Sequence, residues 1–423
     1  MFKCDEEEKE DQHYCNYDVP GYGKFIYKGL YGIQTILSEI RSKNDLGHPL
    51  CKNLRDGFWL FDYTVNRMKN YQPTIMMSRF IDSIFQNCRL IPKFLLPCFF
   101  ETIIRNINNL FFNYSLSKMN TNFLTKDNFV LKLSLSSFAL MGYSRNIIPP
   151  RINPEIINKL SKYVDPKITM SAGLPYFSTS WSRVWGRDIF ISLRGLLVIP
   201  GRTEEAKITI LSIASTIRHG LIPNLISSLG ASPRYNSRDS CWFFIQAIKD
   251  YVEITKDFAI LSQKVYRIFS NDESKPNIVG NNPKHTLSSI IQEIIQKHYD
   301  GIDFIERNNG PEIDSQMKEE GFHVVCGICH ETGFVYGGNR WNCGTWMDKM
   351  GSSEEAHNKG FPATPRDGTS IELVGLLASA LLWLSHVSEK GIYPFKGIVD
   401  KTTTNIIQWG NLRNKIKNNF ENY

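Results

Sequence analysis

Apolar residues recur every three to four positions in several separated stretches, a pattern that predicts amphipathic helices. In the first third of the chain this spacing predicts helices over residues 30–40 and 58–68. Further along it predicts helices over residues 189–197, 204–218, 240–252 and 285–298, and a long buried helix over residues 370–387. Strand patterns are sparse between them. The chain is therefore predicted to be mainly α.

Charge and proline patterns divide the chain into three parts. Residues 1–12 are acidic and are expected to be disordered. Residues 13–152 combine helical patterns with polar breaks, which favours a smaller, mostly helical domain. A proline cluster near residues 149–154 marks its end, because proline cannot continue a helix. Residues 153–423 are therefore interpreted as a second module.

Long loops separate the predicted helices of the second module. They cover residues 173–186, 219–238 and 327–368, and they hold most of its glycines and many of its polar and aromatic residues. Loops of this length inside a compact domain are usually functional. Helices joined in this way favour an all-α toroid whose loops converge on one rim.

Composition narrows the class of protein. The net charge is +7, but the basic residues are dispersed, so a nucleic-acid partner is not expected. Nine cysteines in 423 residues do not form a disulfide framework. The start has no apolar signal core, and the most apolar stretch, residues 90–104, is interrupted by prolines and charges. A cytoplasmic, thiol-reduced protein without a membrane partner is expected.

The densest chemical signal surrounds Asp239. Arg234, Arg238 and Trp242 lie within five residues of it. A carboxyl buried beside aromatic rings can keep its proton near neutral pH, which a general acid requires. The alternative is an Arg–Asp structural pair at the start of an amphipathic helix. From these residues alone both interpretations stay open.

A second signal is the run from Trp185 to Asp188. Asp188 is a candidate acceptor for sugar hydroxyls, while Trp185 is suited to stack on a sugar ring. The alternative is that Asp188 caps the following helix and pairs with Arg187, which needs no ligand. A third signal is the loop over residues 331–348, with four glycines and with Tyr336, Trp341 and Trp346 among its aromatics. Large aromatics in a glycine-rich loop favour a binding loop over a purely structural one.

A fourth pattern, Cys326 to His330, has the spacing of covalent c-type haem attachment. No export signal precedes it. A zinc site would need Cys343 or His323 to complete a ligand set, and no second closely spaced pair is present. We interpret the pattern as coincidence and expect neither a metal nor a cofactor.

Several long blocks together resemble one family. VWGRDIFISLRG, RYNSRDSCWFFIQAIKDY, ETGFVYGGNRWNCGTWMDKMG and, upstream, IRSKNDLGHPLCKNLRDG are similar to the eukaryotic glycogen debranching enzymes, over residues 17–419. The resemblance implies an incomplete (α/α)6 toroid, preceded by part of the central domain of that family. It also implies an inverting amylo-α-1,6-glucosidase that acts on glycogen or limit dextrin.

In that family the general acid falls in the block that contains Asp239. The other blocks surround the glucose site, so the resemblance implies these substrate contacts: Trp185, Arg187, Asp188, Arg238, Trp242, Tyr336, Asn339, Arg340, Trp341, Trp346 and Asp348.

Two departures from the family are expected to matter. The water-activating base of the family lies far toward the C-terminus, so it and the last toroid helices are expected to lie beyond Tyr423. The N- and C-terminal parts of the same enzyme are therefore expected partners. The alternative function is a non-catalytic carbohydrate-binding fragment. The second departure is Cys329-His330, which stands where relatives carry acidic residues.

Overall fold

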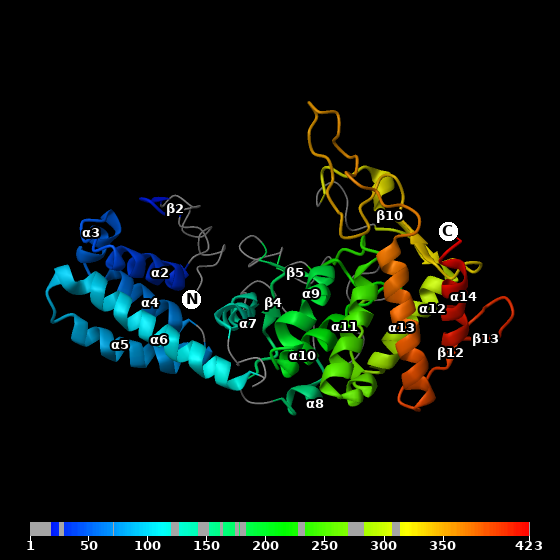
Figure 1. Cartoon of the computed structure of the whole chain (residues 1–423), viewed down its shortest axis with the longest axis horizontal. Coiled ribbons are helices and arrows are strands. Elements are labelled where there is room, and N and C mark those ends of the chain that lie inside the picture. Colours follow the sequence, from blue (N-terminus) through cyan, green and yellow to red (C-terminus); the bar gives the residue numbers. More distant parts are fainter. Residues whose placement is uncertain are drawn as a thin grey trace. The chain divides into compact units, whose positions relative to one another are not determined.

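The chain folds into two compact units, Met1–Lys118 and Met119–Tyr423 (Figure 1). The computed structural model describes residues 18–24, 29–70, 72–119, 127–142, 152–160, 164–173, 177, 183–226, 233–269, 283–306 and 314–422. The acidic start predicted over residues 1–12 lies outside these described residues. The boundary between the units falls after Lys118, whereas the sequence predicted a domain boundary near residue 152. The assignment of each part to a domain of the family stays a prediction.

The first unit is built from helices around one apolar core. Phe61 packs edge-on against Phe85 and Phe100, with ring centroids 4.5 and 5.2 Å away. Its helices are α2 (Gly29–Ser42), α3 (Pro49–Arg55), α4 (Trp59–Lys69), α5 (Ile75–Cys88) and α6 (Leu96–Lys118), with short 3-10 turns at Gln72–Thr74 and Lys93–Leu95 and an antiparallel strand pair of β1 (Asp18–Val19) and β2 (Gly23–Lys24). The helices predicted over residues 30–40 and 58–68 are confirmed as α2 and α4.

The second unit holds the remaining elements. Its helices are α7 (Asn128–Leu140), α8 (Pro154–Ile157), α9 (Gly186–Leu193), α10 (Thr203–Ala214), α11 (Ser240–Thr255), α12 (Leu287–Asp300), α13 (Ile371–Glu389) and α14 (Trp409–Asn419). A π-helical turn, Arg194–Val198, continues α9, and 3-10 turns lie at Phe258–Ser262 and Glu319–Phe322. The prediction of a mainly α chain is confirmed.

Short antiparallel strands connect these helices. They pair as β3 (Met141–Gly142) with β4 (Thr169–Met170), β5 (Val184–Trp185) with β6 (Leu225–Ile226), β7 (Lys264–Val265) with β8 (His285–Thr286), and β12 (Gly397–Val399) with β13 (Ile406–Gln408). A sheet of β9 (Ile302–Ile305), β10 (His323–Ile328) and β11 (Val335–Gly337) has the order β11-β10-β9. The helical spacing gave no indication of this sheet.

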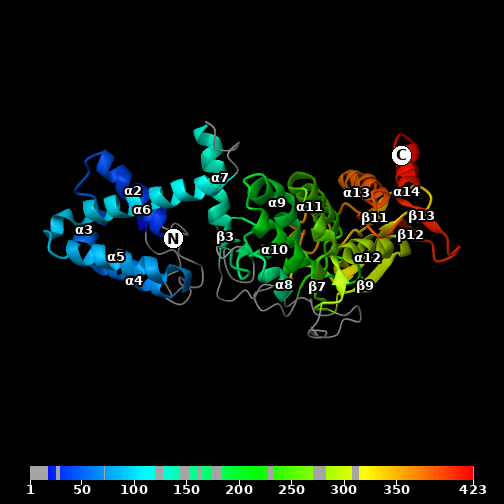
Figure 2. The same ribbon diagram turned by 90° about the horizontal axis from the view of Figure 1, so that it is seen from below.

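In the second unit, several helices pack against the helix that is their second neighbour in sequence. Helix α11 packs against α9 on one side and α13 on the other, while α10 contacts α11 and α12, and α14 contacts α13. Figure 2 shows this alternation from below. The helices predicted over residues 189–197, 204–218, 240–252, 285–298 and 370–387 are confirmed as α9, α10, α11, α12 and α13.

Helix α12 shows why this unit folds as it does. Thr286 caps its N-terminus by accepting a hydrogen bond from Ser289 N at 3.2 Å, and Gly301 ends it with a φ of 88°. Its isoleucines are β-branched, so their helix propensity is modest. The buried face supplies the missing stability, and it consists of Leu287, Ile290, Ile291, Ile294 and Ile295.

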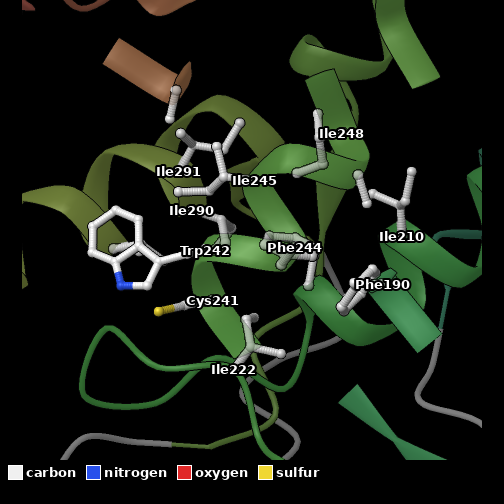
Figure 3. Close-up of a cluster of buried hydrophobic side chains, with 14 of the residues drawn as sticks. Phe190, Ile210, Ile222, Cys241, Trp242, Phe244, Ile245, Ile248, Ile290 and Ile291 are labelled. Carbon is white, nitrogen blue, oxygen red and sulfur yellow. The ribbon is translucent and has the colours of Figure 1, made fainter. Parts of the chain in front are cut away.

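Helix α11 forms the centre of this core. Trp242, Phe244, Ile245 and Ile248 are buried together with side chains from α9, α10 and α12 (Figure 3). The N-terminus of the helix, which begins with Ser240, is therefore held in place from several sides.

Helix α13 is long and apolar enough to cross a membrane by length and composition, as a core helix also can be. Leu373, Leu377, Leu381 and Leu384 are buried in the core of the second unit. These buried leucines are typical of a core helix, and they agree with the buried helix that was predicted over residues 370–387.

Candidate active site

Hydrogen bonds bring the N-termini of α9, α11 and α13 together. Arg187 lies in the first turn of α9, and Asp239 is the residue that precedes α11. Arg187 Nε donates to Asp239, while Arg238 Nη2 donates to Oγ of Ser370, which precedes α13, at 3.2 Å. Helix N-termini carry partial positive charge, which favours carboxylates placed there.

Asp239 lies at the centre of this cluster, and its side chain is fully buried. Arg187 Nε lies 2.9 Å from its Oδ1 and 2.7 Å from its Oδ2. The hydroxyl of Ser237 also donates to Oδ1. Burial raises the pKa of Asp239 above its ordinary value, and the charge of Arg187 and the hydrogen bond from Ser237 oppose that rise only in part. A carboxyl in this setting can carry a proton.

Arg187 connects Asp239 to the long loop before α13. Its Nη1 donates to Asp348 Oδ2 at 2.8 Å, and its Nη2 donates to Ser237 Oγ at 3.3 Å. Burial acts to lower the pKa of Arg187, but the charges of Asp239 and Asp348 outweigh it, so the pKa is raised. The arginine is therefore held as a cation between two carboxylates.

The structure thus contains the Arg–Asp pair at the start of a helix, with Arg187 as the partner of Asp239. The nearer arginines in sequence have other partners. Arg234 lies 3.6 Å from Glu306 and 3.9 Å from Asp314. Sequence distance was misleading here, because the first turn of α9 packs against the first turn of α11.

Trp185 and Asp188 lie beside this cluster. Trp185 pairs with Leu225 across β5 and β6, and its ring meets Phe177 edge-on at 5.9 Å. Asp188 is half-buried in the first turn of α9, and burial raises its pKa against the opposing charge of Arg187. Trp185 and not Asp188 precedes the helix, so Asp188 is not the capping residue of the alternative interpretation.

Gly186 fixes where this segment lies. A Cβ atom at this position would come within 2.2 Å of the Pro223 carbonyl oxygen. Its amide donates to Asn224 O at 2.7 Å. The absence of a side chain therefore lets the start of α9 pack against the loop that follows α10 and directs Arg187 toward Asp239.

Arg238, which the sequence grouped with the substrate contacts, bonds the end of the long loop before α13. Its guanidinium donates to the carbonyl oxygens of Arg366 and Gly368, the latter at 3.0 Å, and to Ser370 Oγ. It is 2% exposed. The side chain therefore fastens the end of the long loop to α11.

Trp242 also differs from its predicted role. It is 1% exposed and packs in the core (Figure 3). Its ring centroid lies 4.7 Å from that of His298. It lies in the first turn of α11 and belongs to the apolar core of the second unit.

Three predicted contacts stabilise the glycine-rich loop itself. Asn339 Oδ1 accepts from Trp341 N at 2.8 Å, and Asn339 Nδ2 donates to Glu320 O at 2.9 Å. The guanidinium of Arg340 and the ammonium of Lys318 lie 4.4 and 4.3 Å from the Trp341 ring centroid. Asn339 and Trp341 therefore shape the loop, and Arg340 lies on its exposed side.

Two aromatics of this region face solvent. Trp346 is 55% exposed, and the guanidinium of Arg366 lies 5.8 Å from its ring. Tyr336 is half-exposed and lines a cavity of about 990 Å³. His330, Glu331 and Phe420 line the same cavity. These rings are accessible for stacking on a sugar.

Ser237 is a residue of the site that sequence reasoning missed. It contacts Asp239, Arg187 and Ser240 through one hydroxyl. A serine two residues before an acid that precedes a helix was the available signal, because serine side chains commonly bond local groups there.

The Cys326 to His330 pattern lies on β10 and the turn after it. Cys326 is fully buried and pairs with Gly337, while His330 Nε2 bonds the Tyr299 carbonyl and the two rings stack at 4.1 Å. A buried Cys326 cannot reach a haem vinyl group from this position. Among the described residues no group of three or more His, Cys, Asp or Glu side chains is placed to hold a metal ion.

Comparisons with known proteins identify relatives. Residues 140–423 match the family model of amylo-alpha-1,6-glucosidase, and residues 1–68 match that of the central domain of human glycogen debranching enzyme. Over 418 residues the chain is 40% identical to the glycogen debranching enzyme of Saccharomyces cerevisiae. This match covers 96% of the chain and 26% of the yeast protein. The cluster around Asp239, Arg187 and Asp348 lies within the matched glucosidase region, and the chain therefore belongs to the amylo-alpha-1,6-glucosidase family of glycogen debranching enzymes.

Proposed function

We propose that this chain takes part in glycogen debranching by hydrolysing α-1,6-linked glucose in limit dextrin. Asp239 is the proposed general acid. The observation that carries the proposal is the full burial of Asp239, with its raised pKa, where three helix N-termini meet. The family match extends over the same residues.

In the proposed reaction Asp239 protonates the glycosidic oxygen as the bond to the leaving chain breaks. Inversion requires a second carboxylate, about 6.5–9.5 Å away, to activate water. We propose that this carboxylate comes from outside residues 1–423, from another part of the same enzyme. The Arg187 cation lies within hydrogen-bonding distance of Asp239, so it is placed to stabilise the carboxylate that remains after proton transfer.

We further propose that α9 to α14 are part of an (α/α)6 toroid. The support is the alternation of the helices. Helices α9, α11 and α13 pack in a row and present their N-termini to one cluster, while α10, α12 and α14 are the intervening helices in sequence. Loops that converge on one rim are where such an architecture holds its site.

The test is glucose release from phosphorylase limit dextrin by the wild-type chain and by Asp239→Asn, each supplied with the remaining parts of the enzyme, which include the second carboxylate. General acid catalysis contributes roughly 10²- to 10⁴-fold to a rate, so Asp239→Asn should reduce release by that factor. Circular dichroism should be unchanged, because the variant keeps the size of the side chain. Asp303→Asn is the matched control, since Asp303 is an exposed carboxylate paired with His323.

Release that survives Asp239→Asn undiminished contradicts the assignment of the acid. A folded wild-type chain that releases no glucose even when the remaining parts of the enzyme are supplied contradicts the hydrolase function and favours the second candidate.

The second candidate is a non-catalytic carbohydrate-binding function. It is favoured by the closed state of Asp239, whose oxygens are held by Arg187 and Ser237, and by the exposed ring of Trp346. Co-sedimentation with glycogen tests it: Trp346→Ala should weaken binding, whereas Asp239→Asn should not.

A further inference from the structure

We infer that Arg187 is a positioning residue for the acid, and that Asp348 shares its guanidinium and so connects the long loop to Asp239. The inference rests on the proposed function. It assigns Arg187 and Asp348 to the control of Asp239 in place of the sugar contacts that the sequence predicted.

The guanidinium of Arg187 donates hydrogen bonds to three different side chains. Its Nε faces both oxygens of Asp239, its Nη1 faces Asp348 and its Nη2 faces Ser237. A guanidinium is a rigid planar group with its donors in a fixed fork. Any displacement that follows one acceptor therefore changes the hydrogen bonds to the others.

The partners of Arg187 come from separate parts of the chain. Arg187 belongs to α9, Asp239 precedes α11, and Asp348 lies in the loop between β11 and α13. The side chain of Asp348 is 28% exposed, compared with 4% for Arg187 and 0% for Asp239. A ligand or a loop movement can thus reach this network from solvent through Asp348.

Charge gives the two residues opposite effects on Asp239. The positive charge of Arg187 favours the ionised form of the acid, and the negative charge of Asp348 opposes it. Asp348 also attracts Arg187 toward itself, which weakens the hold on Asp239. Removal of the Arg187 charge should therefore make Asp239 easier to protonate, and removal of the Asp348 charge should make it harder to protonate.

The test measures the pKa of Asp239 directly, by ¹³C NMR titration of protein labelled at the aspartate carboxyl carbons. Asp239→Asn assigns the signal. Asp348→Asn should lower this pKa by roughly 1 unit, and Arg187→Gln should raise it by at least that much. Glu354→Gln is the matched control, because Glu354 lies in the same loop and pairs with Lys359. It should leave the pKa unchanged.

Opposite shifts show that Arg187 and Asp348 both act on Asp239, and the kinetics of Arg187→Lys test whether Arg187 also positions the acid. An unchanged Asp239 pKa in Asp348→Asn overturns the inference. If Arg187→Gln does not fold, Arg187→Lys replaces it. Lysine keeps the charge without the fork, so kcat should fall roughly 10- to 100-fold while KM is kept. An equal change in kcat and KM overturns the positioning role.

The NMR titration does not depend on turnover. A wild-type chain that releases no glucose with the remaining parts of the enzyme present would end the proposed function, yet the two opposite shifts would still establish or refute the shared guanidinium.

Discussion

In each unit a buried carboxylate lies beside an arginine, and the pairs formed by Glu101 and by Asp239 differ instructively. Glu101 of α6 in the first unit is 1% exposed, and Asp239 in the second unit is fully buried. Each accepts a hydrogen bond from a serine hydroxyl, Ser38 or Ser237. Each has an arginine nitrogen at 2.7 Å.

The difference lies in the arginines. The side chains of Arg41 and Arg105, which face Glu101, are 46% and 43% exposed. Arg187 is 4% exposed and is shared with a second carboxylate. Water screens the exposed arginines that face Glu101, so each contributes little to stability, whereas the buried Arg187 beside Asp239 is not screened in this way. Burial of the acid alone therefore does not distinguish Asp239 from Glu101; the burial and sharing of its arginine do.

The largest effect should come from removing the buried arginine. Arg187→Met leaves Asp239 and Asp348 without their shared cation, and breaking a buried pair costs about 3–5 kcal/mol. Arg41→Met should cost about 1 kcal/mol, because Arg105 and Ser38 still face Glu101. Urea unfolding of both variants measures the difference. Equal losses would mean that the two pairs are equivalent.

The serines should give the next largest effect. Ser237→Ala removes hydrogen bonds to a buried carboxylate and to Arg187 and should cost about 2 kcal/mol. Ser38→Ala removes one hydrogen bond to Glu101 and should cost about 1.5 kcal/mol, the lower end for a charged acceptor. The same unfolding measurement checks both, and a larger loss for Ser38→Ala contradicts the comparison.

The pH dependence of stability should have a definite sign. Because burial raises the pKa of Asp239 above its ordinary 3.8, the folded chain holds this proton more tightly than the unfolded chain. Its contribution to stability is complete below 3.8 and is lost as pH rises through the folded-state pKa. The free energy of unfolding of the wild type, measured relative to Asp239→Asn, should therefore fall with rising pH. A rise instead would mean that the pairing with Arg187 outweighs burial.

The smallest effect is expected at the edge of the first pair. Arg105 lies 3.4 Å from Glu101 and is largely solvated, so Arg105→Ala should cost less than about 1 kcal/mol. Thermal unfolding checks this value. A loss as large as that of Arg187→Met would show that exposure does not separate the two pairs.

Helices α2, α4 and α9 to α13 followed from the spacing of apolar residues, because each buries several of them, whereas α3, α5, α6, α7, α8 and α14 were not predicted. Isoleucines 290, 291, 294 and 295 marked α12 without ambiguity. The sheet of β9, β10 and β11 was missed, since its strands alternate poorly and Cys326 and Ile328 are buried beside Gly327. Its pairing depends on contacts distant in sequence, which local patterns do not contain.

The site was predicted in part. The block around Asp239 and the run around Arg187 were singled out separately, and the structure joins them through one guanidinium. Their separation of 52 residues hid the pairing. The resemblance grouped Trp242 and Arg238 with the substrate contacts, whereas in the structure Trp242 packs in the core and Arg238 bonds the end of the long loop. The roles of the remaining site residues stay predictions.

The close approach at Gly186 has a consequence for how this protein can change. A methyl group there would collide with the Pro223 carbonyl, so even alanine must displace the backbone that carries Arg187. In a saturation mutagenesis library, position 186 should tolerate almost no replacement, although it makes no chemical contribution of its own. Related sequences are then expected to vary at the exposed positions of the long loop and to keep the glycine between Trp185 and Arg187.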